Sequence, residues 1–187
     1  MHDQADERLR AGLAAGREDA FAALYDRYGR SLYRVAWALL RSRPDAEDAV
    51  QEVFLGLARS RGTLAQVENL RAYLFSALRH AAARLAVRSK SQVRPVEELP
   101  DHAAIASGTI DAETSDLLER GLAALPAEQR EVLSLKIDGG LTFAEVAAVL
   151  GIRPNTAASR YRYALGKLRA HLDAERHGPR TPATEPA

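Results

Sequence analysis

The chain contains no cysteine among its 187 residues. Disulfide bonds, thiolate metal ligands and cysteine nucleophiles are therefore excluded, and the composition fits a reducing compartment. The longest wholly apolar run has six residues, Val35 to Leu40, whereas a membrane-spanning helix needs about 20. The amino-terminal residues carry mixed charge with no apolar block behind them, so no secretory signal is expected. Together these absences predict a soluble, cytoplasmic protein without membrane insertion.

Net charge is also almost absent, because 26 Lys+Arg face 25 Asp+Glu and leave a formal net charge of +1. Overall charge therefore identifies no partner, and only its distribution along the chain can do so. The five histidines are scattered, and none stands near acids at a metal-ligand spacing. Gly139-Gly140 follows a predicted helix rather than a strand, so it is no phosphate loop. We expect no catalytic residue, no metal and no cofactor, and the chain is not predicted to be an enzyme.

Alternating strand patterns are missing as well, and apolar residues recur at helical spacing instead. We predict an all-α fold of two small helical domains joined by a flexible linker. The first domain contains helices over about 18–40, 45–59 and 68–88, and the second contains about four. The predicted boundaries are an N-terminal segment at 1–17, a helical bundle at 18–88, a linker at 89–111, a second helical domain at 112–173 and a disordered tail at 174–187.

The second domain carries the sharpest local pattern. Thr142 and Glu145 form a capping box that opens a helix, Gly151 ends this helix, and Pro154 starts another. Two helices joined by a short turn with glycine indicate a helix-turn-helix, although an ordinary helical hairpin is the alternative. Residues 153–169 hold five basic residues and no acidic one. A helix in a DNA groove needs such cations, whereas a solvated helix more often mixes both signs.

The first domain also contains segments whose charged residues are all of one sign, one basic and one acidic. Residues 69–96 hold six basic residues and no acidic one, with aromatic residues among them, which is typical of a single-stranded nucleic-acid track. Residues 45–54 hold four acidic residues and no basic one. A solvated basic face and acids that only cap a helix are the alternatives. If both faces are functional, they indicate two partners, one of which is not nucleic acid.

These strings resemble a known family. DAEDAVQEVF, followed by LRAYLFSALRHAAARLAVR, resembles region 2 of the extracytoplasmic-function (ECF) sigma factors, the small members of the bacterial sigma-70 family. LPAEQREVLSLKIDGGLTFAEVAAVLGIRPNTAASRYRYALGKLR resembles their region 4. The two similarities cover about residues 18–88 and 117–172, in the family's order.

The resemblance implies a sigma factor that binds core bacterial RNA polymerase, recognises the −35 and −10 promoter elements and promotes strand opening. The residues implied to bind the beta-prime clamp of the polymerase are Asp45, Glu47, Asp48, Gln51, Glu52 and Phe54. Those implied to bind the −10 element, partly as single strand, are Arg61, Arg71, Tyr73, Arg79, His80, Arg84 and Arg88. Those implied to bind the −35 duplex are Arg153, Asn155, Thr156, Ser159, Arg160 and Arg162. Many family members are also held inactive by an anti-sigma factor, but no residue here indicates one.

Two other interpretations remain open. A stand-alone helix-turn-helix transcriptional regulator would bind DNA as a dimer without polymerase, and would need a surface for self-association. A helical interaction protein would use its basic faces to meet acidic partners. The sigma-factor interpretation, in turn, requires two cationic modules whose arginines are not turned inward.

Overall fold

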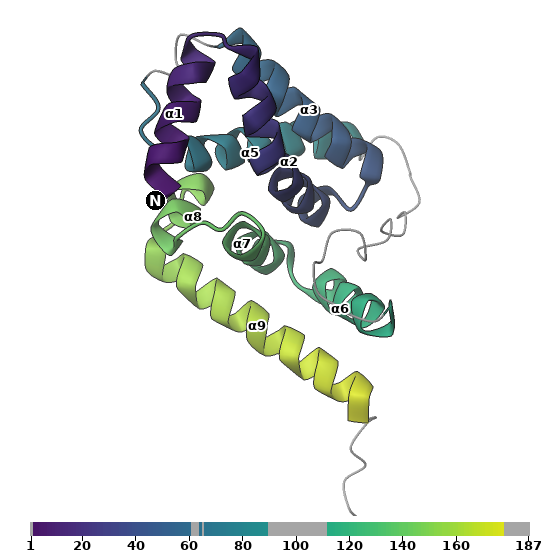
Figure 1. Ribbon diagram of the computed structural model, residues 1–187. Helices are drawn as coiled ribbons and strands as arrows, with labels where there is room; N and C mark the ends of the chain where they lie inside the picture. Colours follow the sequence, from purple (N-terminus) through teal and green to yellow (C-terminus); the bar gives the residue numbers. More distant parts are fainter. Residues whose placement is uncertain (1, 61–63, 65, 90–111, 178–187) are drawn as a thin grey trace, which may run out of the picture.

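The computed structural model of the chain describes residues 2–60, 64, 66–89 and 112–177. Within these residues every regular element is a helix, which confirms the predicted all-α class. The first half contains α1 (His2–Ala14), α2 (Glu18–Leu40), α3 (Arg43–Arg59) and α5 (Leu70–Ser89), and the second half contains α6 (Ala112–Ala124), α7 (Ala127–Ile137), α8 (Phe143–Leu150) and α9 (Pro154–His177) (Figure 1). Of the predicted linker at 89–111 and the predicted tail at 174–187, residues 90–111 and 178–187 lie outside the described residues, as does the site prediction at Arg61. The predicted bounds were wrong where the structure describes them: residue 89 is the last of α5, and residues 174–177 continue α9 because its helix runs further than the sequence pattern indicated.

Helix α1 is the element that the sequence pattern did not predict. Its apolar face is short, with Leu9 and Leu13 four residues apart, and Leu13 is fully buried. Polar contacts complete the docking, because the Tyr28 hydroxyl donates to Asp6 over 2.7 Å. Burial and this carboxylate both raise the pKa of Tyr28. A face so short gives little periodic signal, so only packing against α2 and α5 reveals the helix.

The break between α2 and α3 follows from three consecutive local features. Arg41 ends α2 in the left-handed conformation, with φ at 52°. Ser42 then caps α3 by accepting a hydrogen bond from the Asp45 N–H over 3.4 Å. Pro44 is tolerated in the first turn because the N–H that it lacks would have no partner inside the helix there. The chain therefore reverses here within a few residues.

The turn between α7 and α8 requires its glycines. A Cβ on Gly139 would lie 2.6 Å from the Leu135 carbonyl oxygen, and Gly140 has φ of +63°. The predicted capping box follows, because the Thr142 N–H donates to Glu145 over 2.6 Å and the Glu145 N–H donates to Thr142 over 3.2 Å. Both glycines and the box agree with the sequence prediction of a helix-turn-helix.

The two halves share one buried apolar cluster. Helix α7 packs against α2, and α8 packs against α5, so that α7 and α8 lie between the first half and α9 (Figure 1). The cluster includes Leu32, Val35 and Leu78 from the first half and Leu135 and Val146 from the second. A smaller cluster holds α6, α7 and α9 together within the second half. In this conformation the halves therefore form one packed body rather than separated modules.

Candidate protein and nucleic-acid interfaces

Helix α3 presents an exposed stripe on its outer side. Asp48, Gln51, Glu52 and Leu55 are all exposed and follow one another at steps of three, one and three residues, which places them on one face of the helix. The Leu55 side chain is 47% exposed. We call these four residues the acidic stripe. It combines negative charge with one apolar side chain, a combination suited to a basic protein surface.

The other residues of the predicted polymerase-binding set differ from the stripe in their exposure or their partners. Asp45 is buried in the first turn, at 7% exposure. Glu47 forms an ion pair with Arg43 at 2.9 Å. The Phe54 ring packs on the core, with its centroid 5.2 Å from that of the exposed Tyr25. Of this set, Glu47, Asp48, Gln51 and Glu52 are therefore exposed, whereas Asp45 is buried and Phe54 is half-buried against the core. Leu55 was missed, although its seven-residue spacing from Asp48 indicated it.

Helix α5 carries its cations on two different edges. Arg71 and Arg79 are eight residues apart, so they lie about 80° from each other around the helix. Both are half-buried and point to the second half: Arg71 donates to the Gly140 carbonyl over 3.1 Å, and Arg79 donates to Glu131 over 2.9 Å. We call these two residues the inward edge of α5.

The outward edge of α5 consists of His80, Arg84 and Arg88, which recur every four residues and are all exposed. Arg84 donates to Glu52 of the acidic stripe over 2.6 Å, so the two oppositely charged faces of the first half meet. The Tyr73 ring is half-buried against the core. The predicted −10 set is thus distributed over two edges. The requirement that its arginines not be turned inward is met by Arg84 and Arg88, which are exposed, but not by Arg71 and Arg79.

The helix-turn-helix presents the start of α9 to solvent. Arg153, Asn155 and Arg162 are exposed, whereas Thr156 and Ser159 are half-buried. The Ser159 hydroxyl donates to the Thr156 carbonyl over 3.0 Å, so it is held against its own helix. All of the predicted −35 residues therefore lie within the first turns of one helix or directly before it.

Arg160 differs from its neighbours on α9. Its side chain is 28% exposed and forms an ion pair with Glu128 of α7. Tyr163 is 67% exposed on the same helix as Arg162 and is not among the predicted −35 residues. The helix is anchored behind this face by Tyr161, whose ring packs edge-on against Phe143 with centroids 5.5 Å apart.

Across the part of the chain that the structure describes, no group of three or more His, Cys, Asp or Glu side chains is placed to hold a metal ion. Among the same residues, no helix is both long and apolar enough to cross a lipid bilayer.

Comparisons with known proteins agree with this arrangement. Residues 24–92 match the family Sigma-70 region 2, and residues 115–168 match Sigma-70, region 4. The chain is 30% identical over 167 residues to the ECF RNA polymerase sigma factor SigM of Mycobacterium tuberculosis, covering 89% of this chain and 84% of SigM.

Two solved structures share the fold. CnrH, in complex with the cytosolic domain of CnrY, superposes with a TM-score of 0.65 at 27% identity, covering 91% of this chain and 99% of CnrH. The sigma factor RpoE, in complex with the anti-sigma factor NepR from Bartonella quintana, also gives a TM-score of 0.65, at 23% identity, covering 83% of this chain and 98% of RpoE.

Proposed function

The chain belongs to the ECF sigma factors of the sigma-70 family, and from this premise we propose which of its surfaces carry each step of transcription initiation. The acidic stripe of α3 binds core RNA polymerase. Three of its residues are polar or acidic, and Leu55 adds apolar area at the same place. Charge complementarity of this kind guides association and selects the partner, while burial of the exposed Leu55 under the partner adds stability to the complex.

Helix α5 then binds the −10 element once its strands separate. Its sequence from Leu70 to Ser89 contains no acidic residue, so its cations face a DNA backbone without internal repulsion. Taking a base out of the stack costs a few kcal/mol, and phosphate contacts to several arginines offset this cost. Aromatic stacking falls to Tyr73, because Phe75 is fully buried.

Helix α9 binds the −35 duplex in the major groove. Arg153 and Arg162 are suited to phosphates, and Asn155 to a base edge. Because both DNA-binding parts belong to one chain, docking of either part raises the effective concentration of the other. Each contact can therefore be weak, which fits a chain with a net charge of only +1.

The observation that carries this proposal is the order of three elements in one chain: an acidic helix, a basic helix and a helix-turn-helix. Run-off transcription with purified core polymerase and a defined promoter tests it. We expect a discrete transcript only when this chain is added. A chain that binds promoter DNA as a dimer, but neither binds core polymerase nor yields a transcript, would support the stand-alone regulator instead.

We also propose an anti-sigma partner for this chain. The proposal is supported by RpoE, which shares the fold and whose solved structure contains an anti-sigma factor. Affinity capture of the chain from its own cells tests this step: a captured protein should lower run-off transcription when it is added back in purified form. Captured proteins that leave transcription unchanged would contradict it.

A further inference from the structure

A short segment, residues 66–69, leads into α5, and we call it the entry segment. Its Val67 N–H donates to the carbonyl of the fully buried Leu64 over 3.2 Å. Its last residue, Asn69, caps α5 by accepting a hydrogen bond from the Ala72 N–H over 2.9 Å. The predicted −10 residues of α5 follow directly after it. The position of the entry segment therefore determines where these side chains begin.

Helix α1 reaches the entry segment through one arginine. The Arg10 guanidinium donates to the Val67 carbonyl, 57 positions further along the chain. The Arg10 side chain is 26% exposed, and the carboxylate of Glu7, one turn earlier on α1, lies 3.6 Å from it. A charged donor makes a stronger hydrogen bond than a neutral one, and partial burial strengthens it further. Arg10 therefore ties α1 to the segment that precedes the −10 residues.

Helix α1 is a firm support for Arg10 because it lies tightly on α2. A Cβ on Gly12 would lie 2.6 Å from the Cβ of Ala20, so the two backbones approach closely at that point. Leu13 is fully buried beside this approach. Nearer the start of α1, Asp6 accepts the hydrogen bond from the Tyr28 hydroxyl. The position of Arg10 is thus fixed from both sides along its own helix.

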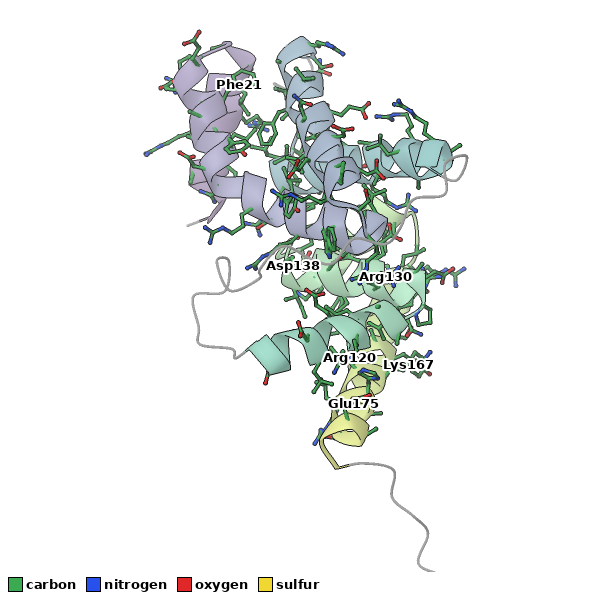
Figure 2. All side chains as sticks on the ribbon, turned by 90° about the vertical axis from the view of Figure 1, so that its right-hand side faces the viewer. Phe21, Arg120, Arg130, Asp138, Lys167 and Glu175 are labelled. Carbon is green, nitrogen blue, oxygen red and sulfur yellow. The ribbon has the colours of Figure 1, made fainter. Side chains whose placement is uncertain are left out.

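The close approach of α1 to α2 lies away from the second half of the chain. Figure 2 shows Phe21, the residue after Ala20, at the end of the first half that is far from Arg130 on α7. A change at Gly12 is therefore remote from the packing of α7 on α2.

The space between α1 and the entry segment is not filled by side chains. A crevice of about 360 Å³ lies between α1, the entry segment and the start of α5, and its walls include Asp6, Arg10, Glu68 and Arg71. Groups that face an open space lose the dispersion contacts that a packed interface would give them. The alignment of the entry segment with α1 therefore depends on the Arg10 hydrogen bond rather than on a filled apolar interface.

We infer that α1 positions the entry segment through Arg10, and that single-strand binding at the −10 element depends on this contact whereas −35 duplex binding does not. Arg10 is a positioning residue, which acts on the −10 strand through the side chains of α5. A segment that is fixed before DNA arrives binds more tightly, because less ordering remains to oppose binding. The inference rests on the proposed function of α5 and goes beyond it, because the family match to region 2 begins at residue 24, after α1.

Substitution of Arg10 in the holoenzyme tests the inference. Fluorescence anisotropy measures the affinity for a single-stranded −10 oligonucleotide of the promoter used for run-off transcription, and for its −35 duplex. We expect Arg10→Ala to lower the −10 affinity by about fivefold, and to weaken the preference for the cognate over a base-substituted oligonucleotide, while the −35 affinity stays unchanged. Arg10→Lys should restore most of the −10 affinity, because an ammonium can donate to the same carbonyl. Arg8→Ala, at an exposed position of the same helix, is the matched control and should bind as the parent does.

Salt dependence separates positioning from a direct contact with DNA. An arginine that binds a phosphate of single-stranded DNA contributes about 0.7 to the slope of log affinity against log salt concentration. We expect Arg10→Ala to leave this slope unchanged, since its effect passes through α5. A slope that falls by about this amount would make Arg10 a phosphate contact and would overturn the positioning role.

A second variant moves α1 and keeps Arg10. The Cβ that Gly12→Ala adds has to push α1 away from Ala20, so the −10 affinity should fall while the −35 affinity stays. Circular dichroism and urea titration check that the variant is folded. A folded Gly12→Ala chain with the parental −10 affinity would contradict the inference.

The parent holoenzyme distinguishes a failure of this inference from a failure of the proposed function. If the parent transcribes, and Arg10→Ala has the parental −10 affinity and sequence preference, the positioning role is refuted while the proposed function stands. If the parent holoenzyme neither binds the −10 oligonucleotide nor transcribes, the proposed function fails, and the inference fails with it.

Discussion

Helices α5 and α9 have similar sequences but different surroundings in the folded chain. Both start with a long stretch free of acidic residues. On α5, two of the predicted DNA-binding arginines are held by the second half and a third by Glu52. On α9, Arg153 and Arg162 remain exposed, and only Arg160 has an acidic partner among the predicted residues. One-signed charge therefore marks a candidate DNA-binding helix, but it does not reveal whether the helix is accessible.

The largest expected effect is a loss of affinity for core polymerase, which brings both helices to a promoter. Asp48→Arg with Glu52→Arg reverses the acidic stripe, so affinity for core polymerase should fall by about 100-fold or more through like-charge repulsion. Glu7→Arg with Glu68→Arg, two exposed acids outside α3, is the control and should bind normally. Circular dichroism checks that both proteins remain helical. Normal assembly of the stripe variant would remove α3 from the polymerase interface.

The next prediction compares two buried clusters, the one shared by the halves and the one within the second half, by the effect of a substitution in each on stability and on the radius of gyration. Leu135 belongs to the shared cluster, and Leu133 of the same helix belongs to the smaller one. Both are buried, so Leu135→Ala and Leu133→Ala should each lower the free energy of unfolding by about 2–5 kcal/mol in urea titrations. Only Leu135→Ala should also enlarge the radius of gyration before unfolding. An equal enlargement in both variants would mean that the clusters are not distinct in solution.

A smaller effect distinguishes the arginines of α9. Arg160→Ala should weaken binding to the −35 duplex by about 1–3 kcal/mol and relax specificity at one position, if this side chain leaves Glu128 for a base. Arg162→Ala should instead weaken binding uniformly across sequences and reduce the salt dependence by about one charge. Fluorescence anisotropy on cognate and scrambled duplexes measures both. Unchanged affinity of Arg160→Ala would leave this residue with a structural role beside Glu128.

The smallest effect is a pH dependence at the boundary of the halves. Burial alone would raise the pKa of Glu145, but hydrogen bonds from Thr142 and Asn69 outweigh it and lower the pKa overall. A lowered carboxyl pKa adds stability that is present above the unfolded value, about 4.3, and is lost as the pH falls through the folded value. The stability difference between the parent chain and Glu145→Gln should therefore be constant from pH 7 to 5 and shrink below about pH 4.3. Urea midpoints measured at each pH check this, and a difference that grows on acidification would contradict it.

Much of the local structure could be predicted because its causes are local. Pro44 and the capping box at Thr142 and Glu145 act within a few residues, so the bounds of α2 and α3 lie within two residues of the prediction and α8 begins directly after Thr142. Helix α1 was not predicted because its apolar face is too short to show a helical period. Asp45 is buried, Leu55 is exposed and the neighbouring Phe54 packs on the core. These differences depend on which helices pack against α3, and no local sequence pattern gives that information.

Composition and spacing along the chain were enough to predict an all-helical protein and a pair of helices that a helix-turn-helix or a helical hairpin would fit, and they showed three segments whose charge is of one sign. Only the packed molecule decided which of those charges face solvent, since Arg79 meets Glu131 across 52 positions of sequence. Contacts of that range depend on how whole helices lie against each other, and helix packing is set by the summed fit of many apolar side chains.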